Sequence, residues 1–143
     1  MNDWKNELNK FYKALQPDPI FSSKDQVTDF LVCVVTVTFE EISNELRQYA
    51  KNIKIKRYVS KVSISFEDEI AKRSVFTVSI DMKYQTISFP HTLNGTTTYT
   101  SGVKIKNRNE LKKELIVAAF MEFFLSRKEK LKEIEKIRNL PVD

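Results

Sequence analysis

The sequence predicts an α+β fold: a three- to four-stranded antiparallel sheet packed on one face by two long helices plus a short N-terminal helix, in the order α-α-β-β-β-β-α. Toward both ends of the chain, apolar residues recur every three or four positions, which is the period of a helix. In the middle, apolar and polar residues alternate, which is typical of strands with one solvated face. The chain has 143 residues, 41% of them hydrophobic, so we expect residues 1–143 to form a single domain.

A short amphipathic helix is expected from Asp3 to Leu15. Pro17 and Pro19 end it, because the residue before a proline avoids helical geometry. The apolar residues of this segment fall on one side of the helix: Trp4, Leu8, Phe11, Tyr12 and Leu15.

The first long helix is predicted from Lys24 to Asn52. Ser23 can cap its N-terminus, with Gln26 as the reciprocal partner three residues on. An unbroken apolar stripe supports it: Leu31, Val35, Phe39, Ile42, Leu46 and Tyr49. Residues 30–39 are also rich in β-branched side chains, which favour strands, and in that alternative a shorter helix begins where this segment ends. Cys33 lies in the same segment, where we expect it to be buried and unreactive.

The alternating segments predict three strands and a fourth: 62–66, 76–82, 87–89 and about 96–101. A change of parity between the second and third predicts a turn or bulge at 83–85. Asn94-Gly95 predicts a hairpin, because a type I′ turn needs positive φ at both central residues. We expect helices to cover one face of the sheet and a face of Ser, Thr and Lys to stay solvated.

A second long helix ends the chain, with Asn107 or Asn109 as its N-cap. Its first half, ELIVAAFMEFFL, is apolar nearly all round and is expected to be the central core helix. Its second half is rich in charge, so we expect residues 127–143 to project from the domain or to be covered by a second chain. The narrow apolar stripe of this half is the predicted protein interface: Leu131, Ile134, Ile137 and Leu140.

The sequence lacks the residues of the common catalytic and metal sites. One histidine and one cysteine cannot form a usual structural zinc site, and two glycines exclude the glycine-rich nucleotide loops. We therefore predict no catalytic residues, no metal, no cofactor and no enzymatic activity. His91 is interpreted as a surface turn residue. The carboxylates of 67–69, and those of Glu40, Glu41 and Glu45, are interpreted as solvated charge.

The chain also lacks sequence signs of export or membrane insertion. The N-terminus has no apolar core of a signal peptide, and the longest apolar run, 30–39, is too short to cross a bilayer. A single cysteine excludes an internal disulfide. We expect a cytoplasmic protein that binds no membrane.

Basic charge is concentrated in the middle of the chain. The formal net charge is +5, and residues 51–66 and 82–109 contain no acid. Lysines at a helix N-terminus oppose the helix dipole, so they have little local reason to be there without an anionic partner. Residues 51–61 and 104–113 are therefore predicted to form a basic strip, although a solvated lysine-rich surface is the alternative. The strip consists of Lys54, Lys56, Arg57, Lys61, Lys104, Lys106, Arg108, Lys112 and Lys113.

Three functions are considered from the sequence, of which an enzyme that uses the carboxylates or the hairpin is the least favoured. The first is a small non-catalytic binding protein that acts through protein–protein contacts, with self-association into a homo-oligomer as its specific version. The absence of catalytic residues and the narrow stripe of the last helix favour it. The alternative is a nucleic-acid-binding protein that uses the basic strip.

Overall fold

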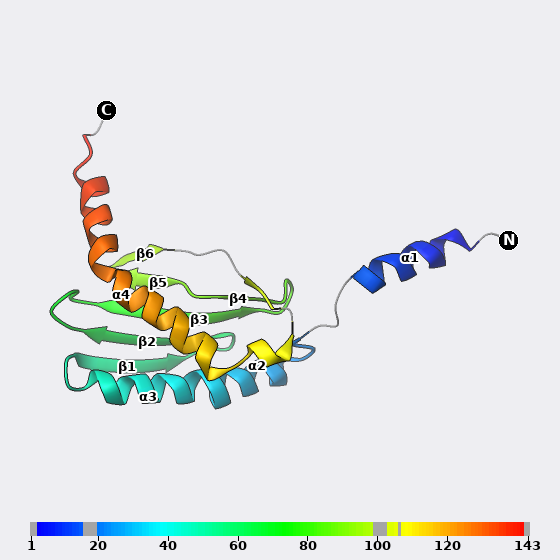
Figure 1. Ribbon diagram of the computed structural model, residues 1–143, viewed down its shortest axis with the longest axis horizontal. Coiled ribbons are helices and arrows are strands. Elements are labelled where there is room, and N and C mark those ends of the chain that lie inside the picture. Colours follow the sequence, from blue (N-terminus) through cyan, green and yellow to red (C-terminus); the bar gives the residue numbers. More distant parts are fainter. Residues whose placement is uncertain (1–2, 16–19, 99–102, 106, 142–143) are drawn as a thin grey trace.

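The protein has the predicted α+β architecture, with helices on one face of an antiparallel sheet. The computed structural model describes residues 3–15, 20–98, 103–105 and 107–141. In Figure 1, α4 (Lys113–Arg138) crosses in front of the sheet, and the helix made of α2 and α3 runs beside strand β1. Helix α1 (Trp4–Leu15), which matches the predicted N-terminal helix, lies apart from this body.

The first long helix is continuous through the disputed apolar segment. It consists of α2 (Lys24–Phe30), a π-helical segment η1 (Leu31–Thr36) and α3 (Val37–Leu46). The amide of Gln26 donates to the Ser23 hydroxyl, as the predicted cap requires. The wider π turn accommodates the β-branched run, and the Thr36 hydroxyl donates to the carbonyl of Leu31 at 2.7 Å.

Two predictions for this helix are wrong. It ends at Leu46 rather than Asn52, and Tyr49 is 78% exposed, because the chain turns there and β1 begins at Lys51. Cys33 is exposed rather than buried. It lies two residues from both Leu31 and Val35, so it points to the side of the helix away from the buried stripe.

The sheet contains more strand segments than the three to four predicted. Its order is β1-β2-β3-β4-β7, and β5 pairs with both β3 and β6. The segments are β1 (Lys51–Arg57), β2 (Lys61–Glu67), β3 (Ser74–Asp81), β4 (Thr86–Ser88), β5 (His91–Leu93), β6 (Thr96–Thr98) and β7 (Val103–Lys104). Strands β4 and β5 pair with successive halves of β3, so they act as one strand interrupted at Pro90. The predicted Asn94-Gly95 hairpin is confirmed, with φ of 49° and 87°.

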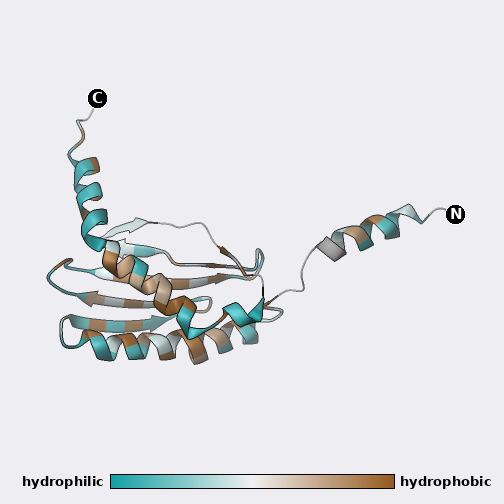
Figure 2. Ribbon diagram, in the orientation of Figure 1, coloured by the Kyte–Doolittle hydropathy of each residue, from teal (hydrophilic) through white to brown (hydrophobic). Residues whose placement is uncertain are grey.

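Aromatic side chains form the core between the sheet and the helices. Phe76 of β3 lies at its centre, with its ring centroid 6.0 Å from that of Phe39 on α3 and 5.5 Å from that of Phe120 on α4. Both helices therefore contact the same face of the sheet. Figure 2 shows the corresponding pattern: apolar residues alternate along the strands and dominate the first half of α4, while its second half is polar.

The second half of α4 is only partly free of the body. Arg127 is fully buried, and Leu131 and Ile134 are half-buried against the core. Beyond them, Ile137 and Leu140 are 68% and 63% exposed, and the end of the helix extends past the sheet in Figure 1. Asn107 caps the short helix η2 (Arg108–Glu110) rather than α4 itself.

Candidate functional site

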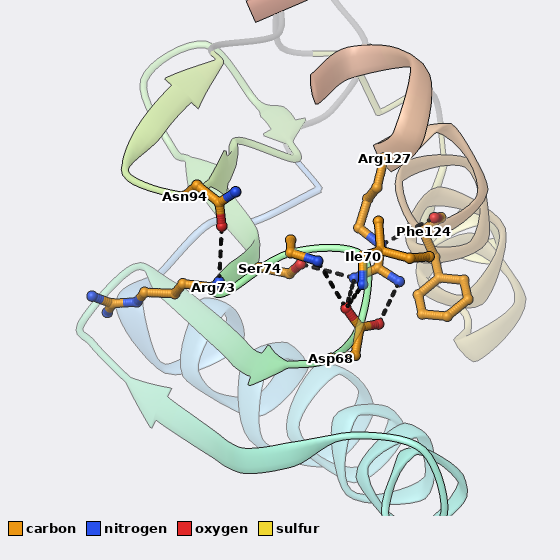
Figure 3. Close-up of polar contacts among 8 residues, drawn as sticks. Asp68, Ile70, Arg73, Ser74, Asn94, Phe124 and Arg127 are labelled. Carbon is orange, nitrogen blue, oxygen red and sulfur yellow. Dashed lines mark hydrogen bonds and ion pairs between the residues drawn. The ribbon is translucent and has the colours of Figure 1, made fainter. Parts of the chain in front are cut away.

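A buried ion pair locks the β2–β3 connection to α4 (Figure 3). The guanidinium of Arg127 binds both carboxylate oxygens of Asp68, at 3.1 and 2.7 Å, and it also donates to the Ser74 hydroxyl at 2.9 Å. It lies 4.2 Å from the ring centroid of Phe124. Asp68 also accepts from the amides that follow it in the turn, so the whole connection is held in one conformation.

The Asp68 carboxylate was expected to be solvated, and this prediction is wrong. Burial alone raises the pKa of Asp68, but hydrogen bonds from Arg127 and the amide of Ala71, with the positive charge of Arg127, outweigh it, so the pKa lies below its usual value. The carboxylate is therefore ionised at neutral pH. Figure 3 shows that Arg73, at the end of the same connection, points away from this cluster.

A cationic groove lies on the open face of the sheet. Lys54 and Lys56 of β1 pair with Ser65 and Ser63 of β2, so all four side chains are on the face opposite Phe76. Lys72 and Arg73 approach the same groove from the β2–β3 connection. The groove encloses about 520 Å³, and its remaining lining comes from Asn52, Tyr58, Phe66, Glu67 and Val75.

The other residues of the predicted basic strip lie elsewhere. Arg57 is on the helix-covered side of β1, where it lines a separate pocket with Leu31 and Val32. Lys61, at the start of β2, places its ammonium 4.9 Å from the ring centroid of Tyr58. Lys113 forms an ion pair with Glu41 of α3, which accounts for its position at the helix N-terminus and raises its pKa.

The remaining members of the strip are not brought to the groove either. Arg108 and Lys112 are exposed at the start of α4, on the helix side of the sheet. Lys106 lies outside the described residues, and for Lys104 only the backbone pairing with Thr86 is described. Lys54 and Lys56 thus share a surface with Lys72 and Arg73, which the sequence prediction did not include.

His91 is a buried residue rather than a surface turn residue, which corrects the sequence interpretation. It is 6% exposed, its Nδ1–H donates to the carbonyl of Phe89, and its Nε2 accepts from the Lys130 ammonium at 2.9 Å. Burial lowers the pKa of His91, and the positive charge of Lys130 lowers it further. Burial also lowers the pKa of Lys130. The imidazole is therefore neutral at neutral pH and serves as an acceptor in the core.

The described residues form neither a metal-binding cluster nor a membrane-spanning helix. Within it, no group of three His, Cys, Asp or Glu side chains could hold a metal ion. None of its helices combines the length and the apolar character needed to span a bilayer.

Two apolar helix surfaces lack a partner in the described chain. The first is the face of α1, whose large side chains are 46–60% exposed: Trp4, Leu8, Phe11 and Tyr12. The second is a groove of about 260 Å³ between α3 and α4, which we call the α3–α4 groove. Its walls are almost wholly apolar and comprise Ile42, Leu46, Val117, Phe120, Met121 and Phe124, with Glu41 and Glu45 along the α3 side.

Comparisons with known protein families, with curated proteins and with solved structures find no match to this chain. Its function is therefore argued from the surfaces described above.

Proposed function

We propose that the protein is a non-catalytic binding protein that acts through protein–protein contacts, and that its partner is a second copy of the same chain. The observation that carries the proposal is the uncovered apolar face of α1. In the proposed dimer, α1 of each copy docks into the α3–α4 groove of the other.

The apolar face of α1 has the spacing of a helix that binds in a groove. Trp4, Leu8 and Phe11 stand at positions i, i+4 and i+7, which places them in one row along the helix. They are 53%, 46% and 60% exposed. Burying one such side chain fully is worth roughly 1.5–3 kcal/mol, so this row has a strong tendency to find an apolar partner.

The α3–α4 groove complements this face in both polarity and charge. Apolar side chains line its floor, and Glu41 and Glu45 border its α3 side. On α1, Lys5 flanks the apolar row on one side and Glu7 flanks it on the other, as the helical period of 100° per residue requires. A docked α1 that turns Lys5 toward α3 therefore places a cation beside Glu45, next to the existing ion pair of Glu41 with Lys113.

The length of the connecting segment favours the groove of a second copy over the chain's own groove. Four residues join α1 to Ile20, and fully extended they span at most about 17 Å between Leu15 and Ile20. Ile42 of the groove lies 18 residues beyond Lys24, which is about 27 Å of helix. Leu8 lies seven residues along α1 from Leu15, which adds about 10.5 Å, so the chain's own groove is only just within reach of Leu8 and is beyond the reach of Phe11. Exchange between two copies imposes no such limit.

Sedimentation velocity on matched variants tests the proposal. We expect Leu8→Glu/Phe11→Glu in α1, and Met121→Glu in the groove, each to convert a dimer into a monomer. Asn6→Glu adds a carboxylate to the side of α1 opposite the apolar row and is expected to leave the dimer intact. Trp4 is the only tryptophan, so its fluorescence should shift to shorter wavelength as protein concentration rises and the dimer forms.

Mixing the two defective variants distinguishes exchange from docking within one chain. An α1 variant still offers an intact groove, and a groove variant still offers an intact α1, so the mixture should regain heterodimers that hold one of the two contacts. A wild-type monomer at all accessible concentrations would overturn the proposal. So would a dimer that survives Leu8→Glu/Phe11→Glu but is lost on Ile137→Glu/Leu140→Glu, which would move the interface to the end of α4.

A further inference from the structure

We propose that the cationic groove on the open face of the sheet binds single-stranded nucleic acid. This inference concerns the face of the sheet opposite the α3–α4 groove, so it goes beyond the proposed self-association and does not depend on it. The binding residues would be Lys54, Lys56, Lys72 and Arg73, with Tyr58 at one end of the groove.

Four cations line one groove without neutralising partners. Within the described part of the chain, none of the ion pairs involves Lys54, Lys56, Lys72 or Arg73. The one acid in the lining, Glu67, is already engaged by the amide of Asn52 at 2.8 Å and by Lys51 at 3.5 Å. Cations gathered in a groove without counter-charges create a positive potential that attracts an extended anion.

Protection of a sheet edge does not account for this group. Strand β1 is at the end of the strand order, and lysines on such a strand discourage pairing with other sheets. That explains Lys54 and Lys56 at most. Lys72 and Arg73 belong to the β2–β3 connection and approach the groove from another side, so the cations converge on a space rather than only line an edge.

The fold fixes the second pair of cations in place. Asp68 at the start of the connection is held by buried Arg127, and the amide of Arg73 at its end donates to the side-chain oxygen of Asn94 at 3.1 Å. Asn94 itself has a φ of 49°, a conformation that asparagine tolerates better than most residues. A connection anchored at both ends presents its charges on a fixed backbone, which lowers the entropic cost of binding.

The remaining lining fits an unpaired strand better than a duplex. Tyr58 is 52% exposed and the Lys61 ammonium lies 4.9 Å from its ring centroid, so a base can stack on the ring face that Lys61 leaves open, which requires an unpaired base. Ser63 and Ser65 also line the groove; the Ser65 hydroxyl can donate to a phosphate oxygen, whereas the Ser63 hydroxyl is hydrogen-bonded to that of Thr77 at 2.7 Å. Lys54 and Lys56 stand two residues apart on one strand, about 6.7 Å, which suits successive phosphates of an extended chain.

Fluorescence anisotropy with a labelled 12-nucleotide oligothymidylate tests the inference. At 50 mM salt we expect saturable binding, with log affinity falling against log salt at a slope of about −3, because each contacted phosphate contributes about −0.7 for single strands. Lys54→Glu/Lys56→Glu should weaken binding at least tenfold. Tyr58→Leu should weaken it roughly tenfold while leaving the salt slope unchanged, since stacking releases no counterions.

The matched control is Arg108→Glu/Lys112→Glu, which makes the same change of charge on the helix side of the sheet. We expect it to retain affinity within threefold, and a loss equal to that of the groove variant would show that only net charge matters and would overturn the inference. Absence of binding at 50 mM salt, or equal binding of a duplex or of polyglutamate, would also overturn it. Repeating the titration with Leu8→Glu/Phe11→Glu separates this result from the fate of the dimer.

Discussion

The two faces of the sheet are built from the same strands but differ in what their side chains contact. In β2, Ile64 is fully buried beneath the helices, whereas its neighbours Ser63 and Ser65 remain partly exposed on the open face. In β3, Phe76 contacts aromatic rings from both α3 and α4, whereas the Thr77 hydroxyl forms a hydrogen bond with that of Ser63 across the strands. The covered face therefore carries most of the stability, and the side chains of the open face contribute less to it.

The β2–β3 connection joins these two faces. Asp68 at its start is held inward by Arg127, and Arg73 at its end points outward, as Figure 3 shows. A buried polar contact on the covered side can thus position charges on the open side. Substitutions should accordingly affect either stability or binding, depending on the face they touch.

The largest effect is expected at Arg127. Replacing Arg127 with Leu leaves the Asp68 carboxylate buried without its partner, and breaking such a buried pair costs about 3–5 kcal/mol of unfolding free energy. Urea unfolding followed by circular dichroism measures it. The double variant Arg127→Leu/Asp68→Asn removes the orphaned charge and should recover part of the loss. A single variant as stable as wild type would show that the covered face does not depend on this pair.

A smaller effect is expected from the protonation of His91. Burial, with the charge of Lys130, lowers its pKa in the folded state below the ordinary 6.5, so the unfolded chain takes up the proton first as pH falls. The stability contributed by the neutral imidazole is therefore fully present above the unfolded-state pKa. It is lost as the pH falls through the folded-state pKa. Each unit of pKa difference corresponds to about 1.4 kcal/mol.

Unfolding free energies at pH 7.5, 6.5 and 5.5 check this dependence. His91→Gln keeps an acceptor for Lys130 but does not titrate, so its profile over this range should be flatter than that of wild type. Glu122 lines the same pocket as Lys130 and is retained in both proteins. The lowered pKa of Asp68 affects stability only as the pH falls toward about 4 and below, where the unfolded chain takes up the proton before the folded protein does. The effects of His91 and Asp68 therefore occur in different pH ranges. Parallel profiles of the two proteins would contradict the assignment to His91.

Elements with a clear period were predictable from the sequence, and long-range polar contacts were not. The alternation in β2 and β3 and the apolar stripe of α2–α3 specify strand and helix because they determine which residues can be buried together. The helix end at Leu46 was missed because Tyr49 continues the helical spacing, although the chain has already turned toward β1. The interrupted strand at Pro90 was missed because the alternation of apolar residues does not show that β5 continues the pairing of β4 along β3.

The site residues illustrate the same limit. Arg127 and Asp68 are 59 positions apart, and the local sequence around each residue does not identify the other as its partner. One signal was available: Phe120, Phe123 and Arg127 follow the buried stripe of α4, so a charge at that position needs a buried partner. Lys72 and Arg73 were left out of the basic strip because only the hairpin geometry of β2 and β3 brings them beside Lys54 and Lys56.

The smallest effect on stability is expected on the open face. Lys54 and Lys56 are exposed and have no ion pair in the described chain, so Lys54→Glu/Lys56→Glu should change the unfolding free energy by no more than about 0.5 kcal/mol. Thermal unfolding beside wild type measures it. The same variant is expected to lose oligothymidylate binding, so the two results together separate recognition from folding. Destabilisation comparable to that of Arg127→Leu would show that the open face also supports the fold, and the contrast between the two faces would then fail.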